Sequence, residues 1–336
     1  MGSALSQVGG IHHVSAIAGD AQQNVDFYAG VLGLRLVKQT VNFDDPTAYH
    51  LYYGDAVGSP GSLLTFFPYP RSRKGRAGVG QVAQTSLAVP QGAIGFWLHR
   101  FLTHGVDHDA PGRRLGQTTV VFRDRDGLQL ELVTADVGTE ARPWVSREIA
   151  GEHAIFGIHG VTLWEHSVEQ TENVLGMLGF RRDATEGGTT RFIVDGGGAT
   201  RVVDVRAVGG FLGAVGGAGT VHHVAFRVAD DATELSLREA AIGLGLSPTP
   251  VTDREYFRSV YFREPGGVLF ELATDQPGFT VDEPLAQLGS KLMLPPQYEP
   301  SRAEIAAKLP PLHDPLAASL GASFIHESLT SENKNP

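Results

Sequence analysis

The chain has 336 residues, 42% of them hydrophobic, so it can bury a sizeable core either as two domains or as one repeated architecture. Its formal net charge of −10 gives no basic footprint for nucleic acid or for an anionic membrane surface. Because the sequence contains no cysteine, disulfides, thiolate metal sites and cysteine nucleophiles are excluded, and nitrogen and oxygen atoms must hold any metal.

No apolar run reaches the roughly 18 residues that a membrane span needs, and the first residues lack a secretory signal pattern. We therefore expect a cytoplasmic protein that binds neither membrane nor nucleic acid, and the sequence leaves self-association into a homo-oligomer open. The first six residues match the myristoylation pattern at Gly2, but small residues after the initial Met are also common for other reasons.

In chain order, the sequence repeats one pattern of predicted elements. Residues 10–17, 157–164 and 220–227 are similar β-prone runs, and residues 122–134 align without a gap on residues 262–274. Helical apolar spacing occurs at 24–32, 92–105, 172–178 and 232–245, each time followed by short β-prone stretches. This pattern predicts four βαβββ modules.

The predicted modules cover residues 9–70 and 80–135 in an N-terminal half (9–135), and residues 155–207 and 219–275 in a C-terminal half (155–275). We interpret the glycine-rich segment 209–219 as a linker, because it has no Gly-Lys-Ser/Thr of a phosphate loop. Residues 276–336 form a C-terminal tail that we expect to pack outside the repeats, with a weakly helical part at 301–308.

The opening runs of the modules differ in their histidines. The opening runs of modules one and four carry the pairs His12-His13 and His222-His223, whereas the opening run of module three has a single histidine and that of module two has none. A concave sheet built from modules one and four would bring Glu271 close to one histidine of each pair. Two imidazoles and one carboxylate are typical of non-haem Fe(II) oxygenases. Side chains alternate along a strand, so one histidine of each pair coordinates and the other faces elsewhere or supports it, without the pattern deciding which.

Other candidate ligands are interpreted as structural. Glu131 is the counterpart of Glu271 in module two, but it would face Gly160, so we expect it to hydrogen-bond inside the second sheet. Residues 124–127 resemble part of a calcium loop, but the aligned residues 264–267 indicate a hairpin turn. Six histidines without partners at ligand spacing are interpreted as incidental residues of loops or helices: His50, His99, His104, His108, His153 and His166.

Residues 11–14, 19–22 and 26–33 resemble the opening signature of the vicinal oxygen chelate superfamily, which includes glyoxalases, bleomycin-resistance proteins and ring-cleaving dioxygenases. Residues 49–55 and 58–61 are similar to its hydroquinone-cleaving branch, including the 2,6-dichlorohydroquinone 1,2-dioxygenases. The resemblance implies an α+β fold in which the four βαβββ modules pair into two halves with concave mixed sheets.

The same resemblance implies roles for individual residues. It selects His13, His223 and Glu271 as metal ligands, which leaves His12 and His222 beside them. It also puts Arg254 and Tyr261 at substrate-facing positions, and Ser15 where the family has a small hydroxyl residue. As catalytic residues, His12, His222 and Tyr261 would handle protons, and Arg254 would stabilise anionic intermediates.

The implied function is that of an Fe(II)-dependent ring-cleaving dioxygenase of aromatic catabolism, with Mn(II) as the alternative metal. Its partners would be O2 and a small dihydroxylated aromatic substrate, either a hydroquinone or a catechol. One alternative is a glyoxalase-like metal-dependent isomerase or thiol transferase, but residues 63–67 lack the carboxylate that a fourth ligand would need. The other is a non-catalytic resistance protein that binds an aromatic drug, which would need no metal ligands.

Overall fold

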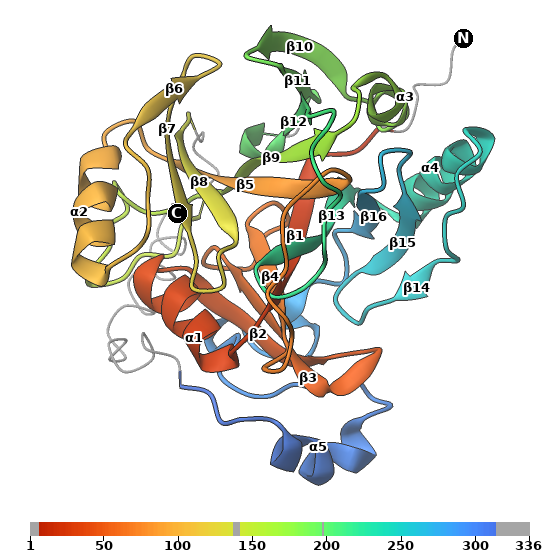
Figure 1. Ribbon diagram of the computed structural model, residues 1–336. Coiled ribbons are helices and arrows are strands. Elements are labelled where there is room, and N and C mark those ends of the chain that lie inside the picture. Colours follow the sequence, from red (N-terminus) through yellow and green to blue (C-terminus); the bar gives the residue numbers. More distant parts are fainter. Residues whose placement is uncertain (1–6, 137–141, 197, 314–336) are drawn as a thin grey trace, which may run out of the picture.

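The computed structural model describes residues 7–136, 142–196 and 198–313, and two curled, eight-stranded mixed sheets form its framework (Figure 1). The first sheet contains β1 (Ile11–Ala18), β2 (Arg35–Asn42), β3 (Asp45–Gly54), β4 (Leu63–Pro68), β13 (Thr220–Val228), β14 (Thr252–Asp253), β15 (Arg258–Arg263) and β16 (Leu269–Thr274). The second sheet contains β5 (Gln81–Val89), β6 (Gly112–Arg114), β7 (Gln117–Arg123), β8 (Gln129–Thr134), β9 (Gly157–Glu165), β10 (Arg181–Glu186), β11 (Thr189–Ile193) and β12 (Val202–Ala207). The helices are α1 (Ala21–Val25), which continues as a π-helical turn over Asp26–Val31, α2 (Ile94–His104), α3 (Glu169–Met177), α4 (Asp231–Gly243) and α5 (Arg302–Lys308).

Each sheet joins two modules that are distant in the sequence. The strand order β14-β15-β16-β13-β1-β4-β3-β2 combines modules four and one, and β10-β11-β12-β9-β5-β8-β7-β6 combines modules three and two. In the middle of each sheet the opening strands pair antiparallel, β1 with β13 and β5 with β9. The predicted α+β architecture of four βαβββ modules is confirmed, and each sheet takes one module from residues 9–135 and one from residues 155–275.

A β-bulge occurs at each His-His pair. The ladder between β1 and β13 skips His12 on one strand and His222 on the other, so each is an extra residue in an otherwise continuous pairing. The ladder between β5 and β9 skips Ala83 and His159 in the same way. Because a bulge interrupts the alternation of side chains, the two histidines of a pair can lie side by side instead of on opposite faces. The alternation of side chains between the two faces of the sheet, which the sequence led us to expect, is therefore interrupted at His12 and His222.

The module helices lie outside the sheets and contribute one apolar face each, as α2 shows. Trp97 and Phe101 are four residues apart, so they share one face of the helix and both are fully buried, whereas Leu102 on the opposite face is 70% exposed. The Phe101 ring packs on Phe122 of β7 with centroids 4.7 Å apart. Gly105 ends α2 in the left-handed region at φ 61°, a conformation that glycine adopts without strain.

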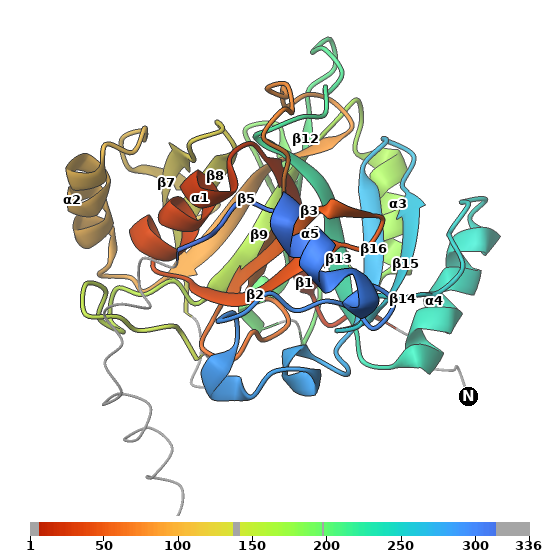
Figure 2. The same ribbon diagram turned by 90° about the horizontal axis from the view of Figure 1, so that it is seen from below.

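The described part of the C-terminal tail packs against module one from outside, as expected, and α5 lies against β3 (Figure 2). The tail contacts β2 through Lys38. The Lys38 ammonium is fully buried and donates to Asp282 at 2.6 Å and to Glu283 at 2.5 Å. Farther along, Tyr49 of β3 donates to the carbonyl of Pro310 at 2.8 Å. Gly2 and the end of the tail lie outside the described residues.

Within those described ranges, no helix combines the length and the apolar character that a bilayer crossing requires.

Candidate metal centre and its cavity

Three buried side chains converge on the inner face of the first sheet: His13 of β1, His223 of β13 and Glu271 of β16. The two imidazole Nε2 atoms are 3.2 Å apart. Glu271 Oε2 lies 3.2 Å from Nε2 of His13 and 2.8 Å from Nε2 of His223. All three residues are at most 4% exposed. The structure thus brings together the three residues that the sequence suggested as ligands.

The chemistry of this cluster fits a divalent metal. Glu271 Oε2 is buried and accepts no hydrogen bond within the described residues, although two imidazole nitrogens face it. Burial alone would raise the pKa of Glu271, but the facing imidazoles of His13 and His223 outweigh burial and hold this pKa well below its usual range. Burial lowers the pKa of His223, so its imidazole is neutral at pH 7. A carboxylate facing two imidazole nitrogens is a donor set for one metal ion, and a three-residue set leaves coordination positions open.

The other carboxylate oxygen of Glu271 is held by a neighbouring strand. Ser259 of β15 donates a short hydrogen bond to Glu271 Oε1. The carboxylate therefore has one oxygen fixed by the protein and the other turned toward the histidines.

His12 and His222 lie directly beside the ligand pair because of the bulges. His12 Nδ1 is 2.9 Å from His13 Nδ1, and His222 Nδ1 is 2.7 Å from His223 Nδ1. Each first histidine therefore engages the ring nitrogen of its neighbour that points away from the cluster, which fixes the orientation of that ring. His12 is buried, whereas His222 is exposed at the rim of the cavity.

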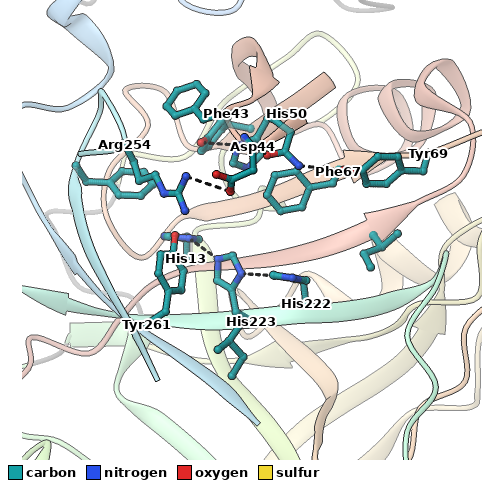
Figure 3. A pocket seen from close by; sticks show the side chains of 15 residues that line it. His13, Phe43, Asp44, His50, Phe67, Tyr69, His222, His223, Arg254 and Tyr261 are labelled. Carbon is teal, nitrogen blue, oxygen red and sulfur yellow. Dashed lines mark hydrogen bonds and ion pairs between the residues drawn. The ribbon is translucent and has the colours of Figure 1, made fainter. Parts of the chain in front are cut away.

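A cavity of about 360 Å³ opens next to the cluster, within the size range of small-molecule sites (Figure 3). Its wall is rich in aromatic rings, including Phe43, Phe67 and Phe257. The Phe257 ring packs on His13 with centroids 5.1 Å apart. A planar aromatic ligand therefore finds apolar surfaces to stack on beside the metal ligands.

Arg254 and Tyr261 both line this cavity, close to the cluster. The Arg254 guanidinium lies 5.4 Å above the Tyr261 ring and is 3.3 Å from Asp44 across the cavity mouth. The Tyr261 ring lies 5.6 Å from that of His223. Burial, followed by the charge of Glu271, raises the pKa of Tyr261, so this side chain stays a neutral phenol at physiological pH.

The interpretation of His50 as an incidental loop or helix residue is wrong. His50 lies on β3, lines the cavity and faces the ligand histidines from the opposite wall (Figure 3). Its partners are Thr65 and the hydroxyl of Tyr52, which also lines the cavity. A signal was available, because His50 and Tyr52 are two residues apart in a run of β-prone residues and would share a face if that run formed a strand. The cavity wall includes none of the other five histidines that were set aside.

The second sheet repeats this geometry with different residues. Glu131 of β8 is the counterpart of Glu271, and its Oε2 accepts hydrogen bonds from Ser86 at 2.6 Å and from Arg114 at 2.6 Å. Arg114 also donates to Asp204 at 2.7 Å, and Arg191 donates to both oxygens of Asp204 at 2.8 Å. Glu131 hydrogen-bonds inside the second sheet as expected, and an arginine guanidinium supplies the positive charge beside it.

Comparison with known proteins places this architecture in a family. The family model of the Glyoxalase/Bleomycin resistance protein/Dioxygenase superfamily matches residues 10–132. Over 303 residues the chain is 46% identical to the putative ring-cleaving dioxygenase MhqO of Bacillus subtilis (strain 168), an alignment that spans 90% of this chain and 96% of that protein. The chain belongs to this superfamily.

Another relative in the superfamily is the chlorohydroquinone/hydroquinone 1,2-dioxygenase of Sphingobium indicum, which is 34% identical over 92% of this chain and 98% of that protein. The crystal structure of a putative dioxygenase from Bacillus subtilis superposes with a TM-score of 0.88 at 45% identity, covering 92% of this chain and 98% of that chain. Glyoxalase I from Zea mays superposes with a TM-score of 0.57 at 15% identity over 79% of this chain and 92% of that chain, a likeness of fold alone.

Proposed function

We propose that this superfamily member is an Fe(II)-dependent dioxygenase that cleaves a dihydroxylated aromatic ring of the hydroquinone or catechol type. The proposal rests on one observation above all: the ligand atoms of His13, His223 and Glu271 converge beside an aromatic cavity of about 360 Å³, whose wall includes both histidines. The names of the relatives, putative ring-cleaving dioxygenase and chlorohydroquinone/hydroquinone 1,2-dioxygenase, support the reaction class.

In this proposal His13, His223 and Glu271 hold the metal. Iron bound there supplies a Lewis acid for a ring hydroxyl and a one-electron route between the ring and dioxygen. Ser259 and the bulged histidines keep the ligand side chains aligned, since each holds the oxygen or nitrogen that points away from the cluster.

The other cavity residues bind and orient the ring. Phe43, Phe67 and Phe257 stack against an aromatic substrate and exclude water from it. Tyr261 is a neutral phenol and can donate a hydrogen bond to an anionic oxygen of the ring. The positive charge of Arg254 stabilises the negative charge that develops as the ring opens to a carboxylate. The neutral imidazole of His222 lines the cavity and can accept the phenolic proton. His12 is not part of the cavity wall and acts on the site through its contact with His13.

The position of Thr65 disfavours the isomerase alternative. Thr65 is aligned with Ser15, two residues after His13, just as Glu271 is aligned with Ala225, two residues after His223. A glyoxalase-like site would need a carboxylate at this position as its fourth ligand, and threonine cannot provide one. The alternative of a drug-binding protein gives no reason for three ligand side chains to converge beside the cavity.

The test is anaerobic reconstitution with Fe(II) or Mn(II), followed by oxygen uptake with a panel of hydroquinones and catechols. We expect bound metal and ring-dependent oxygen consumption in the wild type, and a loss of both by more than about 100-fold in His223→Ala. His166→Ala is the matched control, because His166 is exposed and lies outside the cavity. Metal binding without ring-dependent oxygen uptake would overturn the dioxygenase proposal and leave the metal site standing.

A further inference from the structure

The two strand pairs that flank the cavity are related by an approximate two-fold operation of the first sheet. On one side Tyr261 of β15 pairs with Glu271 of β16, and on the other side Tyr52 of β3 pairs with Thr65 of β4. Because Thr65 is the module-one counterpart of Glu271, Tyr52 is the counterpart of Tyr261. The cavity thus has a tyrosine from each related module.

On the Tyr52 side, a hydrogen-bonded chain replaces the carboxylate. The Tyr52 hydroxyl is 2.8 Å from His50 Nδ1, and His50 Nε2 is 3.0 Å from Thr65 Oγ1. Thr65 Oγ1 is in turn 2.6 Å from Ser15 Oγ. The His50 ring also packs between the rings of Tyr52 and Phe67, each 4.1 Å away between centroids. Both nitrogens and both faces of His50 are therefore engaged, so the ring is fixed.

This fixed imidazole determines what the Tyr52 hydroxyl can offer to a ligand. Burial, followed by the charge of His13, lowers the pKa of His50 well below its usual value, so the ring is neutral and carries one N–H. If that proton is on Nε2, facing Thr65, then Nδ1 accepts the proton of the Tyr52 hydroxyl. The Tyr52 oxygen is then an acceptor at the cavity wall.

The cavity therefore has two unlike walls. The ligand histidines lie on one wall, and on the opposite wall the Tyr52 hydroxyl is held beside His50. A 1,4-dihydroxylated ring has its second hydroxyl on the far side of the ring, whereas the second hydroxyl of a catechol is adjacent to the first. Only the 1,4-arrangement presents one hydroxyl to each wall.

We propose that the Tyr52 hydroxyl, oriented by His50, accepts a hydrogen bond from the second hydroxyl of a 1,4-dihydroxylated ring whose first hydroxyl is held at the His13–His223–Glu271 cluster. This rests on the proposed function and narrows its substrate class to hydroquinones. Tyr52 is the specificity-determining residue, and His50 is a positioning residue that acts through it.

The experiment measures anaerobic binding of 1,4-hydroquinone, catechol and phenol to the Fe(II)-loaded full-length protein by calorimetry. Phenol lacks the second hydroxyl, so the ratio of its Kd to that of hydroquinone isolates the proposed contact. We expect a ratio of about tenfold in the wild type, and of about one in Tyr52→Phe. The control is Tyr69→Phe, because Tyr69 lines the same cavity but its hydroxyl accepts from Asn42 instead. Metal content is measured for every variant.

His50→Phe keeps an aromatic ring between Tyr52 and Phe67 but removes both hydrogen bonds. We expect this variant to lose the same discrimination as Tyr52→Phe, and the double variant to lose no more, because the two residues act as one unit. His50→Gln, which can still bond to Tyr52, is expected to recover part of the ratio.

The outcomes separate this inference from the function on which it rests. Three results for the ratio of the Kd of phenol to that of hydroquinone would overturn the role of Tyr52: a wild-type ratio near one, a ratio that Tyr52→Phe retains, or equal losses in Tyr52→Phe and Tyr69→Phe. In each case, ring-dependent oxygen uptake would still support the proposed function. If the metal-loaded protein neither binds the rings nor consumes oxygen with them, the proposed function fails and this inference falls with it.

Discussion

Replacing Arg114 with methionine tests whether this arginine stabilises the buried carboxylates of the second sheet. Arg114 is 2.6 Å from Glu131 and 2.7 Å from Asp204, and both carboxylates are no more than 3% exposed. Asp204 keeps its paired hydrogen bonds from Arg191, whereas Glu131 keeps only the hydroxyl of Ser86. The variant therefore leaves the buried Glu131 carboxylate without a direct ion pair, with Arg191 as a more distant positive charge.

Removing one partner of a buried ion pair typically costs about 3–5 kcal/mol. The Arg114 side chain is 24% exposed, so water reaches part of this site and reduces the loss. We expect Arg114→Met to lower the free energy of unfolding by about 2–3 kcal/mol. Adding Glu131→Gln removes the unpaired charge and should restore at least half of the loss.

Urea denaturation followed by circular dichroism measures these differences, with Arg113→Met as the control because the neighbouring Arg113 is exposed. The reasoning fails if Arg114→Met is as stable as Arg113→Met, or if Glu131→Gln brings no recovery. Either result would mean that the carboxylates are stabilised by something other than the arginine.

Three further predictions concern single residues. Burial, followed by the charge of Glu264, raises the pKa of Glu165 to about 8. The free energy of unfolding of the wild type should therefore fall by about 1 kcal/mol per pH unit as the pH rises from about 5 to 8. Glu165→Gln should flatten this slope in thermal unfolding. His12→Leu removes the hydrogen bond to His13 and should weaken Fe(II) binding about 10- to 100-fold in anaerobic titration. Tyr261→Phe should keep its metal but lose about 100-fold in kcat for ring-dependent oxygen uptake.

Each of these predictions has a contradicting result. A Glu165→Gln variant with the pH slope of the wild type would show that Glu165 is ionised in the folded protein; exposed Glu239→Gln is its control. Unchanged iron affinity in His12→Leu would remove the supporting role of His12. Unchanged kcat in Tyr261→Phe would leave Tyr261 as part of the cavity wall only.

Much of the first sheet could be predicted from the sequence because the modules repeat. The recurring opening runs and the gap-free match of residues 122–134 with 262–274 predicted the four modules, and the unequal histidines indicated which two modules share the polar site. That reasoning compares equivalent positions, so it works wherever a residue has a counterpart of the same kind.

Comparison of equivalent positions could not identify functional residues whose counterparts in the other modules are of a different kind. His50 corresponds to Ser259 in module four, so no repeated histidine marks it, and its chain to Thr65 depends on pairing between β3 and β4. The bulges at His12 and His222 were equally hidden, because a dipeptide does not reveal the ladder position that is skipped. The network of Arg114 joins residues 90 positions apart and has no local pattern.

The central claim is dioxygen insertion into an aromatic ring at the His13–His223–Glu271 cluster. Its most direct test is the mass spectrum of the product that Fe(II)-loaded protein forms from 1,4-hydroquinone under ¹⁸O₂, quenched quickly to limit exchange with water. We predict a ring-opened product that carries two labelled oxygen atoms with the wild type, and no such product with Glu271→Gln. An unlabelled product, or unlabelled benzoquinone formed equally by both proteins, would contradict the account.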